Sequence, residues 1–178
     1  MENIRKWQIA GAAFTIITGT LLHFVYGWFG GIAWAVIGPV NESTWEHLKL
    51  IFWPAVFFAA AEYFAYGRKT DGFIPVRVTS IITGMASVVV LFYTYSGILG
   101  RNILVMDILV FIISVAVMYV FSYYKLRRPG KLFTMFFSSS CEVSVIAAIC
   151  ILMVIFIYDP PEIGLFQDPL SGGYGIGK

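Results

Sequence analysis

Long apolar stretches fill most of the chain, and short polar segments separate them. Five of these stretches are long enough to cross a membrane as helices, because about 20 residues rising about 1.5 Å each span roughly 30 Å of hydrocarbon. We therefore predict an all-α integral membrane protein, a bundle of five transmembrane helices in a single domain over residues 1–178. The predicted spans cover residues 8–29, 48–67, 78–98, 103–124 and 132–158, and a tail follows over 159–178.

Two further segments do not fit the pattern of a span. Residues 30–39 are apolar but too short to cross, so we expect an interfacial or re-entrant segment there. The tail contains Pro160, Pro161 and Pro169 together with several glycines, which excludes a continuing helix. The pattern leaves open whether this tail is a structured lid or a flexible end.

The basic residues predict the orientation. Of the twelve Lys and Arg residues, nine flank one side of the predicted bundle and three flank the other. Cytoplasmic loops are enriched in Lys and Arg, so we expect a cytoplasmic amino terminus and an extracytoplasmic carboxyl terminus. The nine are Arg5, Lys6, Arg68, Lys69, Arg77, Lys125, Arg127, Arg128 and Lys131, and the three are Lys49, Arg101 and Lys178.

Composition agrees with a multi-pass protein surrounded by membrane lipids. Hydrophobic residues make up 59% of the chain, charged residues only 12%, and the mean hydropathy is +0.82. The net charge of +2 arises from short loops beside apolar spans, so no nucleic-acid partner is expected. Cys141 and Cys150 fall on roughly opposite sides of one predicted helix, so they are not expected to form a disulfide.

Polar chemistry concentrates in residues 41–49, directly before the second span. Ser43 and Glu46 have the spacing of a capping box, in which each side chain satisfies a free amide at a helix start. That structural role leaves Asn41, Glu42 and His47 unexplained. Polar groups beside lipid are costly and often functional, so we predict the rim of a site at this segment.

The first span carries small residues at a strict four-residue spacing, namely Gly11, Thr15 and Gly19. Small residues in this arrangement allow a second helix to approach closely. One further step of four reaches His23, which is therefore expected to point into the bundle. Its position places it about 9 Å from the extracytoplasmic end of the span. The alternative is a histidine with only structural hydrogen bonds.

Other polar or helix-breaking residues lie within the spans. Pro54 is expected to kink the second span and to leave the Leu50 carbonyl without its helical donor. Glu62 is expected to pair with Arg68 or Lys69 near the cytoplasmic side. Asp107 and Glu142 are intramembrane carboxylates, for which a functional role is the default hypothesis.

These residues together predict a polar pocket. The orientation places His23, Glu42, Glu46, His47 and Asp107 in the extracytoplasmic half and Glu142 near the midplane. Two imidazoles with carboxylates suit zinc or another divalent metal that activates water. Without a metal, the same groups could act in acid–base catalysis or proton transfer. Ser138, Ser139 and Ser140 could supply a nucleophile, although serines at a helix packing face are more ordinary.

We assign a role to each candidate residue. The predicted metal ligands are His23, His47 and Glu46. The predicted catalytic residues are Glu42, Glu46 and Glu142. The predicted ligand-binding residues are Asn41, Asp107 and Tyr26.

Residues 39–50, with His23 and Tyr26 upstream, resemble an uncharacterised family of small bacterial membrane proteins. Its members carry the signature P-V-N-E-S-x-W-E-H-L-K between their first two spans, and residues 165–169 with Tyr174 also look similar. The resemblance implies a multi-pass protein of the bacterial plasma membrane and a site location, but no reaction. The small substrate-capturing subunits of vitamin importers fit in size, yet they usually have six spans.

Three classes of function follow from the sequence. The first is binding of a metal ion or small polar ligand in an extracytoplasmic pocket, with hydrolysis of a lipid or envelope substrate as the matching reaction. The second is a proton- or ion-coupled transporter, or a substrate-binding transport subunit, in which Asp107 and Glu142 titrate. The third is a structural or partner-binding membrane subunit. The sequence leaves open whether the protein is an enzyme.

Overall fold

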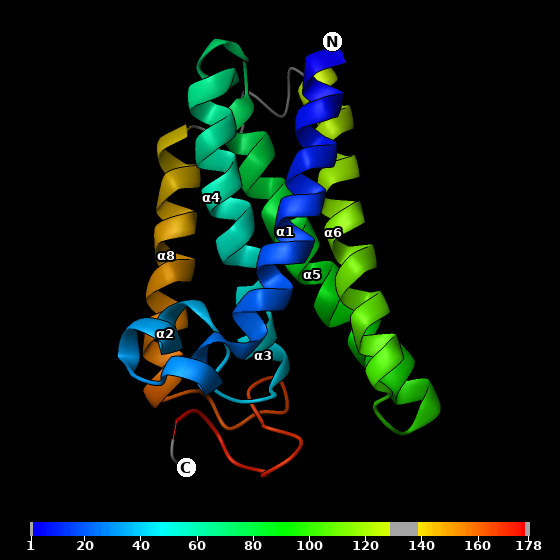
Figure 1. Cartoon of the computed structure of the whole chain (residues 1–178), viewed down its shortest axis with the longest axis vertical. Helices are drawn as coiled ribbons and strands as arrows, with labels where there is room; N and C mark the ends of the chain where they lie inside the picture. The colour runs from blue at the N-terminus through cyan, green and yellow to red at the C-terminus, as the bar shows by residue number, and fades with distance from the viewer. Residues whose placement is uncertain (1, 129–138, 177–178) are drawn as a thin grey trace.

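The computed structural model describes residues 2–128 and 139–176, and its regular elements are helices (Figure 1). In the described part of the chain, the only strand-like pairing is an isolated bridge between Gln167 and Tyr174 in the tail. The helices in chain order are α1 (Glu2–Phe29), α2 (Ile32–Ile37), α3 (Thr44–His47), α4 (Lys49–Ala65), the 3-10 turn η1 (Gly67–Lys69), α5 (Phe73–Leu99), α6 (Leu104–Arg127) and α8 (Ser139–Tyr158).

Among the residues that the structure describes, five helical segments are long and apolar enough to cross a membrane, which agrees with the predicted number. They are Asn3–Phe29, Thr44–Ala65, Phe73–Leu99, Leu104–Arg127 and Cys141–Tyr158. The third helix begins before its predicted span, because a helix continues past the apolar window while its backbone amides and carbonyls still find partners. The predicted start of the fifth span at residue 132, and Ser138, lie outside the described residues.

The long helices run roughly along one axis (Figure 1). The amino terminus lies at one end of the bundle, called here the amino-terminal end. Helices α2 and α3 lie at the opposite end together with the carboxyl-terminal segment 159–176, and we call this the tail end. Residues 41–47 therefore lie between the tail and the long helices.

The small-residue stripe of α1 packs against two helices, as its spacing predicts. Thr15 is fully buried, and its hydroxyl lies 2.9 Å from the Tyr119 hydroxyl of α6. A Cβ added to Gly19 would collide with the carbonyl oxygen of Leu50 and would lie 2.8 Å from Cζ of Phe111. Helix α4 runs through Pro54, which cannot donate to the Leu50 carbonyl. Helix α1 thus packs directly over the carbonyl that Pro54 leaves without its helical donor.

A second polar network lies toward the amino-terminal end, and it corrects the predicted partner of Glu62. Glu62 and Arg77 are both buried, and Arg77 Nε lies 3.0 Å from Glu62 Oε2. Gln8 and Tyr66 donate to Glu62 Oε1 over 2.6 and 2.7 Å. Arg77 also donates to Ser122 of α6 over 3.1 Å. The network therefore joins α1, α4, α5 and α6.

The predicted partners of Glu62, Arg68 and Lys69, are wrong because they lie in the turn itself. Arg68 places its guanidinium 4.5 Å from the ring centre of Phe64 instead. Helices α4 and α5 are joined by the short turn that contains η1. Glu62 and Arg77 lie at similar distances before and after that turn, so the two side chains meet at the same depth in the bundle.

The tail is folded and contacts residues 41–45. The Trp45 amide donates to the Leu165 carbonyl over 3.0 Å, and the Asn41 amide group donates to the Gly175 carbonyl over 3.2 Å. Phe166 is buried between Trp45 and Phe156, with ring centres 5.0 Å from each. The tail is therefore a structured cover over one side of the candidate site segment.

A buried carboxylate organises the turn within the tail. Asp168 accepts hydrogen bonds from the Ser171 hydroxyl at 2.6 Å and from the amides of Leu170 and Ser171. Burial alone would raise the pKa of Asp168, but these hydrogen bonds outweigh it and hold the pKa below its ordinary value of 3.8. The ionised form is therefore the one that the folded tail prefers.

We expect Gly19→Ala to destabilise the protein by about 1–3 kcal/mol, because the added methyl group meets a backbone oxygen that cannot move aside easily. Gly27→Ala in the same helix is the matched control, since a Cβ there meets nothing within 4 Å. Thermal unfolding in detergent measures both. Equal melting temperatures for the two variants would contradict the close packing of α1 on α4.

We expect the tail to loosen in acid. A carboxyl whose pKa is lowered by folding adds stability above its unfolded pKa, and that stability is lost as the pH falls through the lowered folded value. Hydrogen exchange of residues 165–176, corrected for intrinsic rates, should show constant protection down to about pH 4 and less protection below it. Asp168→Asn should lose protection at neutral pH, whereas the exposed Glu162→Gln should not. Unchanged protection in Asp168→Asn would contradict this role.

Candidate functional site

The site begins where the chain turns back after α1. Gly30 and Gly31 have φ angles of 60° and 81°, which lie in the left-handed region that favours glycine. This turn lets the short helix α2 fold back beside the end of α1. A Cβ on Gly38 would lie 2.9 Å from the Leu22 carbonyl oxygen, so the chain passes tightly against α1 before it enters residues 41–47.

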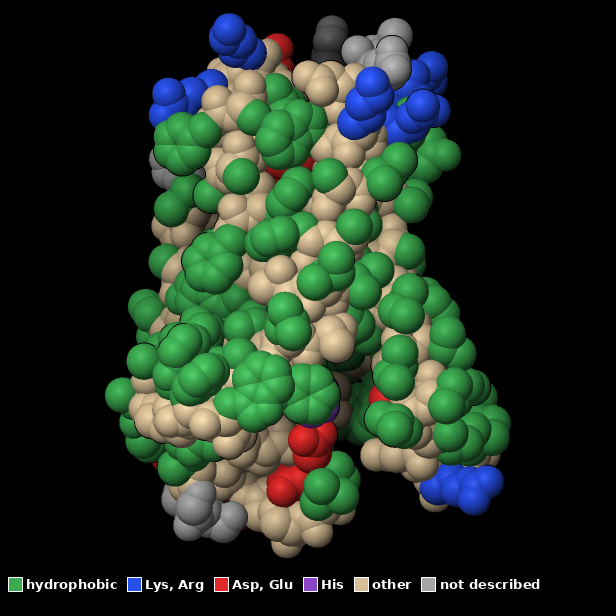
Figure 2. Space-filling view, viewed as in Figure 1, with side chains coloured by type: hydrophobic (Ala, Val, Ile, Leu, Met, Phe, Trp, Pro, Cys, Tyr) green, Lys and Arg blue, Asp and Glu red, His purple; other side chains and the backbone are tan. Residues whose placement is uncertain are grey.

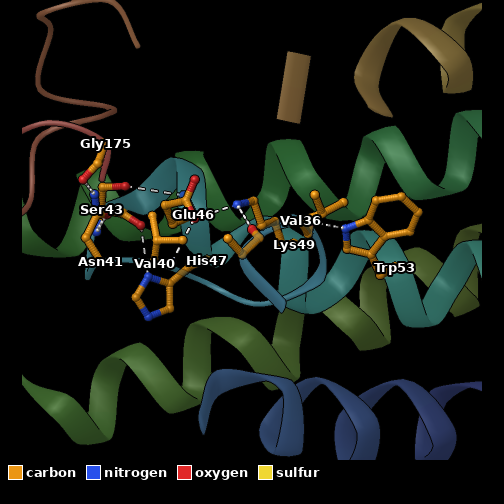
Figure 3. A network of polar contacts seen from close by, with 10 residues as sticks. Val36, Val40, Asn41, Ser43, Glu46, His47, Lys49, Trp53 and Gly175 are labelled. Atoms are coloured by element: carbon orange, nitrogen blue, oxygen red, sulfur yellow. Dashed lines mark hydrogen bonds and ion pairs between the residues drawn. The ribbon is translucent and has the colours of Figure 1, made fainter. Parts of the chain in front are cut away.

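A buried ion pair then fixes the chain between α2 and α4 (Figure 3). Lys49 is fully buried, and its Nζ donates to Glu46 Oε2 over 2.6 Å and to the Ala35 carbonyl over 2.8 Å. The Val40 amide donates to the same Glu46 oxygen over 2.9 Å. Trp53 adds a hydrogen bond from its indole to the Val36 carbonyl. These contacts tie α2, the following loop and α3 to the start of α4.

The predicted capping box forms only in part. The Glu46 amide donates to the Ser43 hydroxyl over 3.3 Å, so Ser43 is the expected cap of α3. The Ser43 amide is satisfied by the Asn41 side chain at 3.0 Å, and not by Glu46. The Glu46 carboxylate is held by Lys49 and Val40 instead, which directs it away from the two histidines. Glu46, a predicted metal ligand, therefore does not lie with the two histidines.

Three side chains from separate parts of the chain do meet. His23 of α1, Glu42 of the loop and His47 of α3 each offer a ligand atom, and these three atoms lie within 4.8 Å of one another. In the described residues, this is the one group of three or more His, Cys, Asp and Glu side chains close enough to hold a metal ion. We call it the His23–Glu42–His47 group. It contains both histidines of the chain.

The orientation of His47 leaves one ring nitrogen directed at Glu42. Its Nδ1 lies 2.9 Å from the Ser43 carbonyl oxygen, which can only accept, so Nδ1 carries a proton. Its Nε2 lies 3.3 Å from Glu42 Oε2. When the ring is protonated, Nε2 donates to Glu42. In the neutral ring, Nε2 holds the lone pair that a metal ion would bind. A backbone carbonyl that fixes the tautomer in this way is the usual second partner of a metal-binding histidine.

His23 faces His47 from the neighbouring helix. The two ring centres are 5.2 Å apart and the rings meet edge to face. His23 Nδ1 is buried and has no hydrogen-bond partner among the described residues. A buried polar atom without a partner costs free energy, and a bound ion is one way to satisfy it.

Glu42 is suited to remain ionised beside the two rings. The hydrogen bond with His47 and the positive charge that the histidines can carry lower the pKa of Glu42 below its ordinary value, against a smaller opposing effect of burial. Its side chain is 42% exposed, so it can also move to adapt to a ligand. An ionised, adaptable carboxylate is a suitable third donor to a divalent cation.

Asp107 lies close enough to His47 to interact with it electrostatically, but it belongs to a different pair. The Tyr95 hydroxyl of α5 donates a hydrogen bond to Asp107 Oδ1. The Ile103 amide donates to the same hydroxyl over 3.4 Å. This pair fixes the turn between α5 and α6 and holds the Asp107 carboxylate on α6.

The remaining predicted residues lie outside the group. Asn41 is engaged with Ser43 and Gly175 and holds the loop and the tail together. Tyr26 lies one turn beyond His23 on α1 and is half-buried. Glu142 is buried in the first described turn of α8, about 24 Å along that helix from Tyr158, where the tail begins. Asp107 and Glu142, the pair expected to titrate in a transporter, are therefore far apart.

Two residues that organise the site were missed from the sequence. Lys49 is used there only for the orientation, although a lysine three residues after Glu46 on a predicted helix also indicates an ion pair. Tyr95 gave no signal, because nothing in its local pattern indicates that the α5–α6 turn will bring it to Asp107.

The chain was compared with known proteins and families. No curated protein and no solved structure matches it. A family model described as a family of unknown function (DUF6512) matches residues 1–176. This agrees with the resemblance to an uncharacterised family, and the signature and the bacterial origin stay predictions. Because the match covers nearly the whole chain, the protein belongs to the family of unknown function DUF6512.

Proposed function

We propose that this protein binds a divalent metal ion, with zinc as the best fit, through His23, Glu42 and His47. The observation that carries the proposal is the approach of these three donors to within 4.8 Å in a chain that has only two histidines. They come from α1, the loop and α3, so no local structural need explains their meeting.

The donor set matches zinc chemistry. Two imidazole nitrogens and one carboxylate oxygen are a common set of three protein ligands, and such sites keep a fourth position for water or substrate. Zinc bonds of about 2 Å in a tetrahedral arrangement separate ligand atoms by roughly 3.3 Å. The His47–Glu42 separation of 3.3 Å already has this value. A modest movement of the partly exposed Glu42 and of the His23 ring would complete the site.

The proposed location is the extracytoplasmic side of the membrane. The positive-inside rule supports this orientation. In the face shown in Figure 2, Lys and Arg side chains gather at the amino-terminal end, and only one such group lies at the tail end. The fourth zinc position would hold a water molecule with a pKa lowered to about 7 or an oxygen of a bound ligand. Hydrolysis of a lipid or envelope substrate is the reaction class that fits.

We expect the purified wild-type protein to carry about one zinc ion per chain and to lose it in His23→Ala and in His47→Ala, because two ligands rarely hold zinc tightly. Glu42→Gln should weaken binding but leave the fold intact. Elemental analysis and zinc titration of detergent-purified protein measure these outcomes.

Two controls separate binding from folding. Glu162→Gln removes an exposed carboxylate at the same end of the bundle and should retain zinc. Glu62→Gln should lower thermal stability through the loss of the buried Glu62–Arg77 pair toward the amino-terminal end, while its folded fraction still binds zinc. A wild type without zinc after growth in zinc-supplemented medium, or histidine variants that retain zinc, would contradict the proposal.

A further inference from the structure

The His23–Glu42–His47 group lies at one wall of a hollow between α1 and α6. Helix α1 packs closely on α6 from Gly11, beside Tyr119, to Gly19, beside Phe111. His23 is one helical turn beyond Gly19, and α1 and α6 diverge toward the tail end (Figure 1). Figure 2 shows the hollow between the tail-end portions of the molecule, with acidic side chains on both sides.

One face of α6 forms the other wall. Phe111, Asp107 and Leu104 follow at intervals of four and three residues, so they share a face of the helix. Phe111 meets α1, while Leu104 at the end of the same face is 73% exposed. This face of α6 therefore contacts α1 at Phe111 but not at Leu104. The hollow lies beyond the contact and widens toward the tail end.

The hollow opens sideways, on the flank of the bundle that would face lipid. Figure 2 is viewed across the long axis of the bundle, and the opening is visible from that direction. Exposed apolar side chains lie on both helices near the site, among them Phe24, whose ring centre is 5.0 Å from that of His23, and Leu104 of α6. Water-soluble ligands have no need of an apolar lateral entrance, whereas a lipid could enter with its chains remaining among the helices.

Aromatic residues place the site at the depth of lipid headgroups. Phe24 stacks on Trp28, Trp28 contacts Phe29, and Phe29 stacks on Trp34 of α2. All four side chains are exposed. Exposed tryptophans concentrate at the membrane–water boundary, and His23 lies about 9 Å from the end of α1. A metal ion at His23 would thus lie within reach of phosphate groups.

The charge of the proposed metal centre suits an anionic oxygen ligand. A divalent cation on two neutral imidazoles and one carboxylate leaves a net charge of +1 at the proposed centre. Arg101 lies exposed in the turn between α5 and α6 at the same end. Asp107, held by Tyr95, lies on the face of α6 that forms the other wall. A phosphodiester oxygen could bind the metal while Asp107 faces a headgroup hydroxyl.

We propose that the ligand of this centre is the phosphate headgroup of a phospholipid that enters sideways between α1 and α6 from the extracytoplasmic leaflet. This inference rests on the proposed metal site and adds the class of its ligand. The metal selects the phosphate, the hollow admits the headgroup, and the apolar borders hold the acyl chains.

The test uses the zinc-loaded full chain in detergent with three probes. These are phosphatidylglycerol, diacylglycerol with the same chains, and water-soluble glycerol phosphate. We expect phosphatidylglycerol to bind at least about tenfold more tightly than either of the others, because only it offers both the charged oxygen and the chains. Removal of zinc by a chelator should abolish this preference.

Two variants separate the metal from the entrance. His47→Gln should lose both the zinc and the lipid preference. Leu104→Trp should retain zinc, measured on the same sample, but bind phosphatidylglycerol more weakly because the larger ring narrows the hollow. Glu162→Gln should change neither.

Each contrary result has a distinct meaning. Equal binding of glycerol phosphate and phosphatidylglycerol would overturn the lipid in favour of a soluble phosphate compound. Equal binding of diacylglycerol, or a lipid preference that survives chelation, would overturn recognition of the phosphate by the metal. Absence of zinc from the wild-type sample would instead overturn the proposed function itself.

Discussion

The arrangement of the tail end depends on one buried ion pair. The Lys49 ammonium group lies between the Glu46 carboxylate and the Ala35 carbonyl, and the Val40 amide completes the contacts of Glu46. A lysine buried in this way is stable only if its charge is matched and its hydrogen bonds are made, and loss of one partner of such a pair typically costs about 3–5 kcal/mol. The pair therefore fixes the path of the chain from α2 to α4, and with it the positions of Glu42 and His47.

The proposed centre combines this fixed loop with a close helix contact. Gly19 brings α1 against the Leu50 carbonyl and Phe111, and one turn later His23 meets His47. The close contact at Gly19 fixes the position of His23 along the bundle axis, and the Lys49–Glu46 ion pair fixes the position of His47. The tail adds a third restraint, because it binds Asn41 and Trp45 on either side of Glu42. Each donor is thus positioned by a different part of the chain, while Glu42 keeps freedom to adapt.

Much of the fold follows from the sequence. Length and hydropathy predict the five long helices, and the spacing of Gly11, Thr15 and Gly19 predicts the packed face of α1 and the inward direction of His23. The sequence also indicates that His47 and Glu42 lie near one another.

The sequence could not show which carboxylate lies with the histidines, because Glu42 and Glu46 are one helical turn apart. Their separation depends on Lys49 and Val40, and that is a matter of tertiary structure. The Glu62–Arg77 and Tyr95–Asp107 pairs could not be predicted for the same reason. The turns between helices determine which residues lie at the same depth in the bundle.

The central claim is that one divalent metal ion is bound by both histidines of the chain. X-ray absorption spectroscopy of the zinc-loaded protein tests it most directly, because it reports the atoms bound to the metal. The account predicts a first shell of nitrogen and oxygen at about 2.0–2.1 Å with outer-shell scattering from two imidazole rings. A shell with sulfur at about 2.3 Å, which would point to Cys141 or Cys150, or a shell without imidazole scattering, would contradict it.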